Sequence, residues 1–355
     1  MYTRACNRQF MLYVKKTFGE IMADLQTQFE KFHDQIKLTD EKKLLREKRD
    51  ILKNNLEEGF KKIDEAPKID TYLLQGSYAI HTGIKPANDD YDIDVGVVFD
   101  CSREDIGALK LKNMVKNALD HPSRDPKLKN PCITIQYSQN GENTYHVDMP
   151  VYVKRDDEEG YDLAWGKSSS SEKWVQSDPK GLVDAINERY TDDEERSQFR
   201  RVVKYLKAWK GNKFSFNVPS IGLTLTAWDM FSSDIDPFDN SRNDLSALKK
   251  TVSRIHSSFR WIGTDNGMSD LYRLEAPLPV VPRNDAFEKL TDKQMTELWT
   301  EMGYLLSALS EAEREERIDS ACKELGKYFL NFPVPTSQGT AKAAIFSLNN
   351  TGASS

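Results

Sequence analysis

The segment that most constrains the fold of this chain is an acidic strand pattern at residues 91–99, YDIDVGVVF. Two carboxylates, Asp92 and Asp94, alternate here with apolar, strand-forming residues. Because successive side chains of a strand point to opposite faces, both carboxylates project from the same side. The segment therefore predicts a strand that carries a pair of acids on one face.

A second, independent signal precedes this pattern. Residues 69–74 read as a strand, and they run directly into a turn formed by Gly76 and Ser77. Paired carboxylates can hold a divalent cation through oxygen ligands, and a glycine-serine turn can offer backbone N–H groups to phosphate. The combination of metal and phosphate sites suggests nucleotidyl transfer.

Such chemistry uses two cations about 4 Å apart, which normally require more than two carboxylates. Asp148 is the candidate for the third, because it is an isolated acid in a predicted strand at residues 145–153. Acidic residues are depleted in strands, so its position needs a reason, and metal ligation supplies one.

Length and composition indicate a globular protein with two lobes. At 355 residues, the chain exceeds the roughly 250–300 residues at which a single core stops growing. No apolar run reaches the ~18 residues of a membrane span, and the N-terminus lacks the pattern of a secretory signal. Residues 1–21 are interpreted as an uncertain extension, with Met1, Met11 and Met22 as possible starts.

The periodicity predicts an α+β first lobe followed by an all-helical second lobe. The first lobe spans residues 22–177 and includes the N-terminal helices, and residues 154–177 are expected to form a surface loop. The second lobe, residues 178–332, is expected to close a nucleotide cleft, and residues 333–355 form a flexible tail.

Charge and cysteine usage narrow the class of protein further. The formal net charge is −6, and the basic runs at residues 42–53 and 200–213 are best explained as solvated helix faces. This makes a duplex-DNA activator improbable, because salt-sensitive DNA binders make roughly six to ten phosphate contacts. The four cysteines are scattered without a CxxC pair, which argues against structural zinc and favours a reducing, cytoplasmic setting.

These motifs resemble a known signature. Gln75-Gly76-Ser77, the Asp92-Ile93-Asp94 strand and the Val147–Pro150 strand look like the DNA polymerase β-like nucleotidyltransferase superfamily, a bilobal fold with a mixed sheet and flanking long helices. Within it, the chain resembles the bacterial cGAS/DncV-like nucleotidyltransferases, or CD-NTases, and above all the DncV-like cyclic GMP–AMP synthase group. Supporting residues lie at 177–180, 206–209 and 219–221.

The resemblance implies a role for each motif. Asp92, Asp94 and Asp148 would be the catalytic acids and would ligate two Mg²⁺ ions, with Mn²⁺ as an alternative. The residues that would bind nucleotide are Gln75, Gly76, Ser77, Lys207 and Ser220, with Ser177 and Asp285 as further candidates. A lysine ammonium is a point charge that suits phosphate. Lys204, one helical turn before Lys207, is therefore the alternative candidate for this role.

The resemblance also implies partners. The substrates would be nucleoside triphosphates, with ATP and GTP as first candidates, and the product a cyclic oligonucleotide messenger of anti-phage signalling, with cyclic GMP–AMP as first choice. Regulatory or effector proteins encoded in the same operon could act on the C-terminal tail, and no membrane partner is expected. Two alternatives stay open: an RNA- or tRNA-directed nucleotidyltransferase, and an inactive nucleotide-binding regulator.

Overall fold

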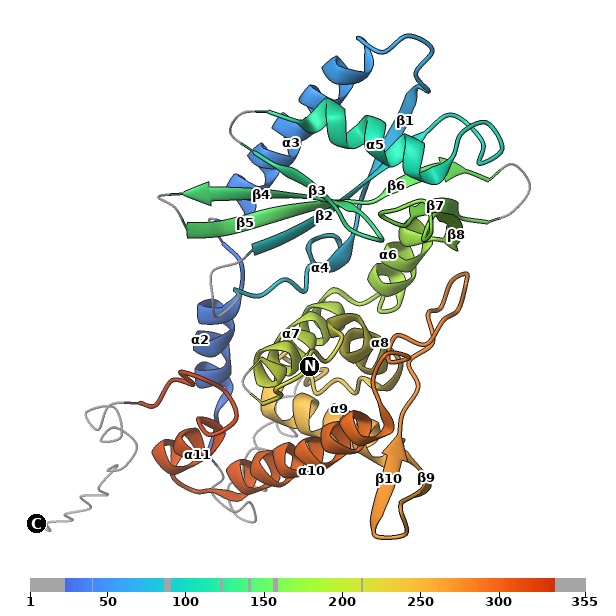
Figure 1. Ribbon diagram of the computed structural model, residues 1–355. Helices are drawn as coiled ribbons and strands as arrows, with labels where there is room; N and C mark the ends of the chain where they lie inside the picture. The colour runs from blue at the N-terminus through green and yellow to red at the C-terminus, as the bar shows by residue number, and fades with distance from the viewer. Residues whose placement is uncertain are drawn as a thin grey trace, which may run out of the picture.

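The chain folds into a layer of sheet and helices that faces a second, mainly helical layer (Figure 1). This computed structural model describes residues 23–39, 41–85, 91–121, 124–139, 142–155, 159–211 and 213–335. The predicted N-terminal extension and almost all of the predicted tail lie outside these ranges. None of the described helices combines the length and the apolar character that crossing a membrane requires.

The first lobe is built on an eight-stranded mixed sheet. Its order is β3-β4-β5-β2-β6-β7-β8, and β1 pairs with β2 outside this path. β2 is central, parallel to both β5 and β6 and antiparallel to β1. The strands are β1 (Ile69–Leu74), β2 (Tyr91–Phe99), β3 (Pro126–Leu128), β4 (Ile133–Gln139), β5 (Glu142–Met149), β6 (Val151–Lys154), β7 (Tyr161–Trp165) and β8 (Lys173–Ser177).

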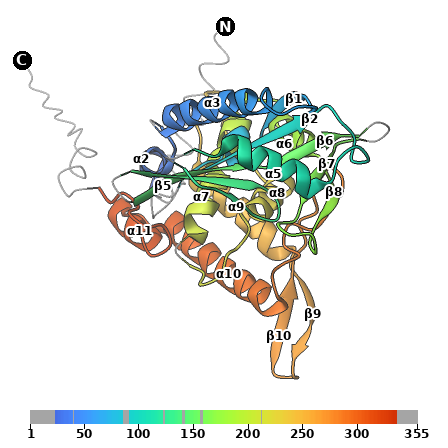
Figure 2. The same cartoon turned by 45° about the horizontal axis from the view of Figure 1, so that its top comes forward.

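Two helices, α3 (Glu41–Phe60) and α5 (Ala108–Leu119), cover one face of this sheet (Figure 2). Ile93 and Val95 of β2 are fully buried in the core that these helices form with the sheet. Strand alternation then directs Asp94 to the opposite face, toward the helical lobe. Burial of the apolar face thus decides where the Asp94 carboxylate points.

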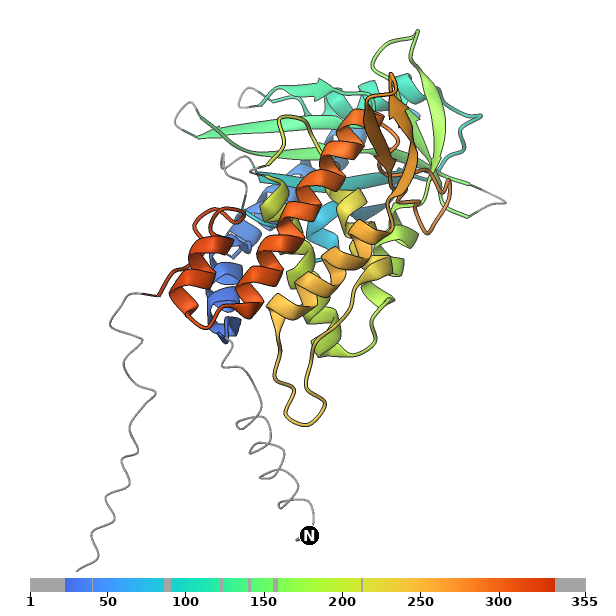
Figure 3. The ribbon, with the colours of Figure 1, turned by 90° about the horizontal axis from the view of Figure 1, so that it is seen from below.

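The second lobe packs its helices around a separate core, seen from below in Figure 3. Its helices are α6 (Pro179–Glu188), α7 (Asp193–Lys210), α8 (Ser220–Met230), α9 (Asp244–Ser257), α10 (Asp292–Arg314) and α11 (Ile318–Leu325). The predicted boundary between residues 177 and 178 falls between β8 and α6. Helix α2 (Gln26–Ile36) contributes Phe29 and Phe32 to this second core. The sequence analysis had instead predicted that the N-terminal helices belong to the first lobe.

The prediction of a surface loop at residues 154–177 was wrong for two segments. β7 and β8 form an antiparallel pair there, with Leu163 opposite Val175 and Ala164 opposite Trp174. The run of serines at 168–171 only joins the two strands. The short apolar runs on each side of the serines indicate strands. They were missed because the segment as a whole is polar in composition.

The second lobe is also not entirely helical. β9 (Arg260–Asp265) and β10 (Ser269–Arg273) form a two-stranded hairpin against α10. Asn266 and Gly267 at its tip both have positive φ, 49° and 72°. Asn-Gly is typical of tight hairpin turns because both central residues of a type I′ turn need positive φ, and the N–H of Met268 closes this turn by donating to the carbonyl of Asp265 at 3.0 Å.

A buried ion pair organises the core of the second lobe. Asp244, at the start of α9, is fully buried and accepts hydrogen bonds from Arg201 Nε at 2.7 Å and Tyr205 Oη at 2.9 Å. Gln198 Nε2 donates to the same carboxylate at 3.1 Å. Burial acts to raise the pKa of Asp244, but the hydrogen bonds and charge of Arg201 outweigh it and hold that pKa below its usual value.

Replacing Asp244 with Ala should destabilise the protein by about 3–5 kcal/mol, because it leaves the Arg201 guanidinium buried without its counter-ion. Asp184→Ala, which removes an exposed carboxylate paired with Lys180, should cost less than about 1 kcal/mol. Urea denaturation followed by circular dichroism measures both. Equal costs for the two variants would contradict the importance of the buried pair.

The same pair predicts a pH dependence. A carboxyl whose folded pKa is depressed stabilises the fold above its unfolded pKa of about 3.9 and loses that contribution as pH falls through the folded value. The stability difference between wild type and Asp244→Asn should therefore be constant from neutral pH down to about pH 4 and shrink below it. A difference that grows on acidification would contradict this account.

Candidate active site

Two of the three predicted catalytic acids lie side by side in the sheet. The parallel pairing of β2 with β5 places Asp94 directly opposite Asp148 and Asp92 opposite His146. Neighbouring strands are about 4.8 Å apart, and residues in register on parallel strands share a face. Asp92 has its backbone in β2, two residues from Asp94, whereas its side chain lies outside the described part of the structure.

The predicted Gly-Ser turn is a one-turn helix, α4 (Gly76–Ala79), that follows β1 directly. Gly76 has φ +61°, and a Cβ added to it would lie 2.0 Å from Asp94 Oδ2. The backbone N–H of Gln75 donates to the carbonyl of Asp94 at 3.2 Å. Glycine is required at position 76 both for its backbone conformation and for the close approach of the Asp94 carboxylate.

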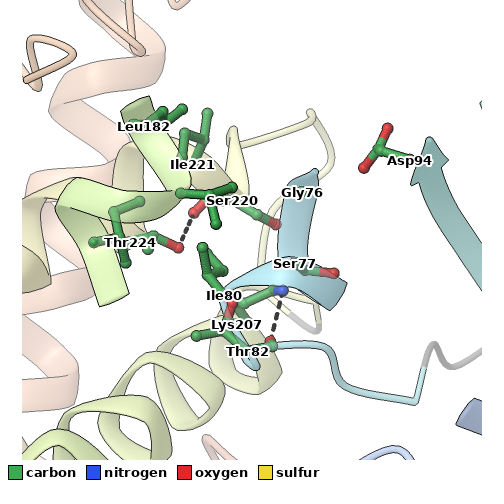
Figure 4. Close-up of a pocket in the computed structure, with 12 residues that line it drawn as sticks. Gly76, Ser77, Ile80, Thr82, Asp94, Leu182, Lys207, Ser220, Ile221 and Thr224 are labelled. Carbon is green, nitrogen blue, oxygen red and sulfur yellow. Dashed lines mark hydrogen bonds between the residues drawn. The ribbon is translucent and has the colours of Figure 1, made fainter. Parts of the chain in front are cut away.

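A cavity of about 260 Å³ lies between the two lobes (Figure 4). Asp94, Gly76 and Ser77 form its wall on the sheet side. The helical lobe supplies Lys207 from α7 and Ser220 from α8. The structure thus brings five of the residues predicted from sequence to one pocket.

Sequence reasoning missed the remaining lining of this pocket. Thr82 and Thr224 add polar groups, and an apolar wall is formed by Ile80, Leu182, Val183, Ile186 and Ile221. Leu182, Val183 and Ile186 belong to the apolar face of α6, which in the sequence looks like any core-facing helix stripe. Only the tertiary structure shows that these three side chains line the cavity.

Lys207, rather than Lys204, faces the pocket. The Lys207 ammonium is largely buried and donates to the carbonyl of Thr82 at 2.9 Å. Lys204 Nζ lies 3.2 Å from His33 Nε2 on α2 instead. Burial, followed by the charge of Lys204, lowers the pKa of His33 to about 4, so this imidazole is neutral at pH 7.

Ser220 is the first residue of α8, and Thr224 Oγ1 donates to its carbonyl at 2.9 Å. The unpaired N–H groups of a helix start carry partial positive charge, which favours anions. The start of α8 and the ammonium of Lys207 therefore both bring positive potential to the pocket.

Three other candidates lie outside the lining. Gln75 Oε1 accepts from Tyr152 Oη at 3.1 Å, and Gln75 Nε2 is buried without a hydrogen-bond partner among the described residues. Ser177, at the end of β8, interacts with the Tyr152 hydroxyl as well. Asp285 accepts from the backbone N–H groups of Ala276 and Phe287, which indicates a structural role in the connector before α10.

The surroundings of Asp148 were not anticipated from the sequence. Thr134 Oγ1 on β4 donates to Asp148 Oδ1 at 2.5 Å, and Lys129 Nζ lies 3.9 Å from the same oxygen. Burial, followed by the charge of Asp148, raises the pKa of Cys132 to about 12, so this thiol stays protonated. No motif connects these residues, because they meet only through the pairing of β4 with β5.

The donor set fits a hard divalent cation. Asp94 and Asp148 can supply carboxylate oxygens from adjacent strands, the ligand type that Mg²⁺ prefers. Among the side chains that the structure describes, no three acidic, cysteine or histidine groups gather in a metal-binding arrangement. The predicted third ligand, Asp92, is not among those side chains.

Comparison with known proteins identifies the lobe that carries this site. Residues 70–152 match the family model described as "Cyclic GMP-AMP synthase DncV-like, nucleotidyltransferase domain". This segment is therefore similar to the nucleotidyltransferase domain of DncV-like proteins. The match includes Gly76, Ser77 and all three predicted acids, and it confirms the resemblance predicted from the sequence.

Relatives extend the comparison beyond this domain. A cyclic GMP-AMP synthase from Escherichia albertii is 31% identical over 168 residues, which is 43% of this chain and 35% of that protein. The matched region therefore spans about a third of the length of this curated relative.

Solved structures of Vibrio cholerae DncV share the fold over most of the chain. The complex with the linear intermediate pppA(3′,5′)pG has a TM-score of 0.68 at 18% identity, covering 90% of this chain and 98% of that one. The apo form gives 0.67 at 19% identity, covering 89% and 97%. Both lobes of this chain therefore have the DncV fold.

Gly76→Ala tests the close approach of α4 to Asp94. The strained backbone should cost roughly 1–3 kcal/mol, and the displaced carboxylate should abolish nucleotidyl transfer. Gly211→Ala is the matched control, because Gly211 has φ −62° and a Cβ there would lie no closer than 3.6 Å to its neighbours. Thermal denaturation and a nucleotidyl-transfer assay compare the two, and equal behaviour would contradict the assignment.

Proposed function

We propose that this protein is a metal-dependent nucleotidyltransferase that joins nucleoside triphosphates into a cyclic oligonucleotide, with cyclic GMP–AMP made from ATP and GTP as the first candidate. One observation carries the proposal. Asp94, which is in register with Asp148, shares a single cavity with the Gly76-Ser77 backbone and with Lys207 and Ser220 of the other lobe.

The donor triphosphate would lie between the two lobes. On the sheet side, the start of α4 would offer backbone N–H groups and the Ser77 hydroxyl to the terminal phosphates. From the helical side, the Lys207 ammonium and Ser220 at the start of α8 would bind the same phosphates. Holding one substrate from both lobes would orient its α-phosphorus relative to the acids, which is a large part of catalysis.

The three acids would hold two Mg²⁺ ions, with Mn²⁺ as a possible replacement. When bound, such ions stabilise charge on the attacking and leaving oxygens of the phosphoryl group. Asp148 would in addition accept a proton from the acceptor ribose hydroxyl. Gln75 and Ser177, which meet at the Tyr152 hydroxyl, would contact nucleotide at the edge of the cavity.

The substrates are inferred from relatives. Vibrio cholerae DncV has been solved with GTP and with a linear pppApG intermediate, and the Escherichia albertii protein is a cyclic GMP-AMP synthase. By the same resemblance, we propose a cytoplasmic role in anti-phage signalling, regulated by operon-encoded proteins that act on the tail beyond Pro333. A duplex-DNA activator is not part of this proposal, given the net charge of −6.

Incubation of the purified protein with all four labelled nucleoside triphosphates and Mg²⁺ tests the activity. Phosphatase-resistant small products are expected, and Asp94→Asn and Asp92→Asn should reduce them at least 1000-fold, on the order of the largest effects of removing a catalytic group. Extension of added RNA would support the RNA-directed alternative, and no turnover under any condition would support an inactive regulator.

Lys207→Met should raise the KM for nucleoside triphosphate about 10-fold or more, because a charge-assisted contact to phosphate contributes about 1.5–3 kcal/mol. Lys204→Met is the matched control from the same helix, and it should leave KM near the wild-type value because Lys204 contacts His33. Initial-rate kinetics with varied triphosphate decide between the two lysines. A larger KM effect at position 204 would reverse the assignment.

A further inference from the structure

A row of three polar residues crosses the sheet at the level of the site. Thr134 on β4 is opposite Asp148 on β5, and Asp148 is opposite Asp94 on β2. Residues in register on neighbouring strands have adjacent side chains on one face. Thr134 is therefore the residue on the far side of Asp148 from Asp94.

Thr134 is almost fully buried, with 2% of its surface exposed. Its hydroxyl donates to Asp148 Oδ1 at 2.5 Å, and Lys129 Nζ approaches that same oxygen to 3.9 Å. Both contacts therefore engage one oxygen of the carboxylate. Contacts to Oδ1 restrict the rotation of the carboxylate, and neither of these two contacts involves Oδ2.

The turn that supplies Lys129 is itself fixed. Lys112 on α5 is completely buried, and its ammonium donates to the carbonyls of Lys129, Asn130 and Gly166 at 2.6, 2.9 and 2.7 Å. Three charge-assisted hydrogen bonds to backbone hold the turn beside β4. Both groups that contact Asp148 Oδ1 are thus carried by rigid elements.

We propose that Thr134 is a positioning residue: its hydroxyl orients Asp148 so that Oδ2 is the oxygen offered to the catalytic cation. This inference rests on the proposed function, in which Asp148 is a metal ligand. Residues that hydrogen-bond a metal-ligating group orient it, and their loss typically weakens metal binding 10–100-fold. Thr134 is almost fully buried and does not line the cavity, so its proposed effect on the site is exerted through Asp148.

The test compares Thr134→Val, which removes the hydroxyl at nearly constant volume, with Thr134→Ser, which keeps the hydroxyl. Mn²⁺ binding is measured by electron paramagnetic resonance of free Mn²⁺, with a non-hydrolysable GTP analogue present. We expect Thr134→Val to raise the Mn²⁺ dissociation constant about 10–100-fold, and Thr134→Ser to stay within about threefold of wild type. In kinetics, Thr134→Val should raise the metal concentration for half-maximal rate more than it lowers kcat at saturating metal.

Thr251→Val is the matched control. Thr251 is equally buried, but its hydroxyl donates to the carbonyl of Ala247 in α9, in the other lobe. It should lose stability without a change in Mn²⁺ affinity. This separates the general cost of a buried threonine replacement from an effect on the metal site.

Two outcomes would overturn the proposal. Wild-type Mn²⁺ affinity in folded Thr134→Val would show that the hydroxyl does not position Asp148. Weakened Mn²⁺ binding in Thr134→Ser, whether or not the Val variant folds, would show that packing of the methyl group matters rather than the hydroxyl. Failure of the proposed function would give a different result. In that case wild type and Asp94→Asn would bind Mn²⁺ equally, because the acids would not form a metal site.

Discussion

The parallel pairing of β2 with β5 is the constraint on which the site depends. It places Asp94 beside Asp148, and a slip of one residue would turn one of these carboxylates into the core under α3 and α5. Burial of Ile93, Val95 and Val147 on that opposite face makes such a slip costly. The acids are therefore held in place by apolar contacts behind the sheet, and the site needs no interactions of its own to set the register.

The pocket depends on a second constraint, the contact between the lobes. Lys207 Nζ donates to the carbonyl of Thr82, and Asn187 Nδ2 donates to the carbonyl of Ala79 at 3.2 Å. Both acceptors belong to the short segment around α4 that carries Gly76 and Ser77. The helical lobe is thus hydrogen-bonded to the segment that would bind phosphate. Movement of one lobe relative to the other would therefore change the geometry of the proposed phosphate site.

Local pattern was sufficient for elements whose side chains repeat in a simple period. The strands at residues 69–74 and 91–99 were predicted with their observed bounds, because burial on one face gives a clear alternation. The strands β7 and β8 were missed since a serine-rich connection masked two short apolar runs. The hairpin β9–β10 was missed although Asn266-Gly267 marks its turn. Helix α2 joined the second core despite its place in the chain, because Phe29 and Phe32 found their apolar partners there.

The sequence by itself determined the chemical inventory of the candidate site: the acids, the glycine-serine pair and a lysine in the helical lobe. The acids can be predicted from strand alternation and the glycine-serine pair from its turn chemistry, whereas the lysine was named because of the family resemblance. Only the tertiary structure decided which groups meet across elements. The choice of Lys207 over Lys204 followed from the packing of α7 against α2 and α4, and the contact of Thr134 with Asp148 followed from the register of β4 on β5. Such contacts depend on long-range pairing, for which the spacing of residues along the chain carries no signal.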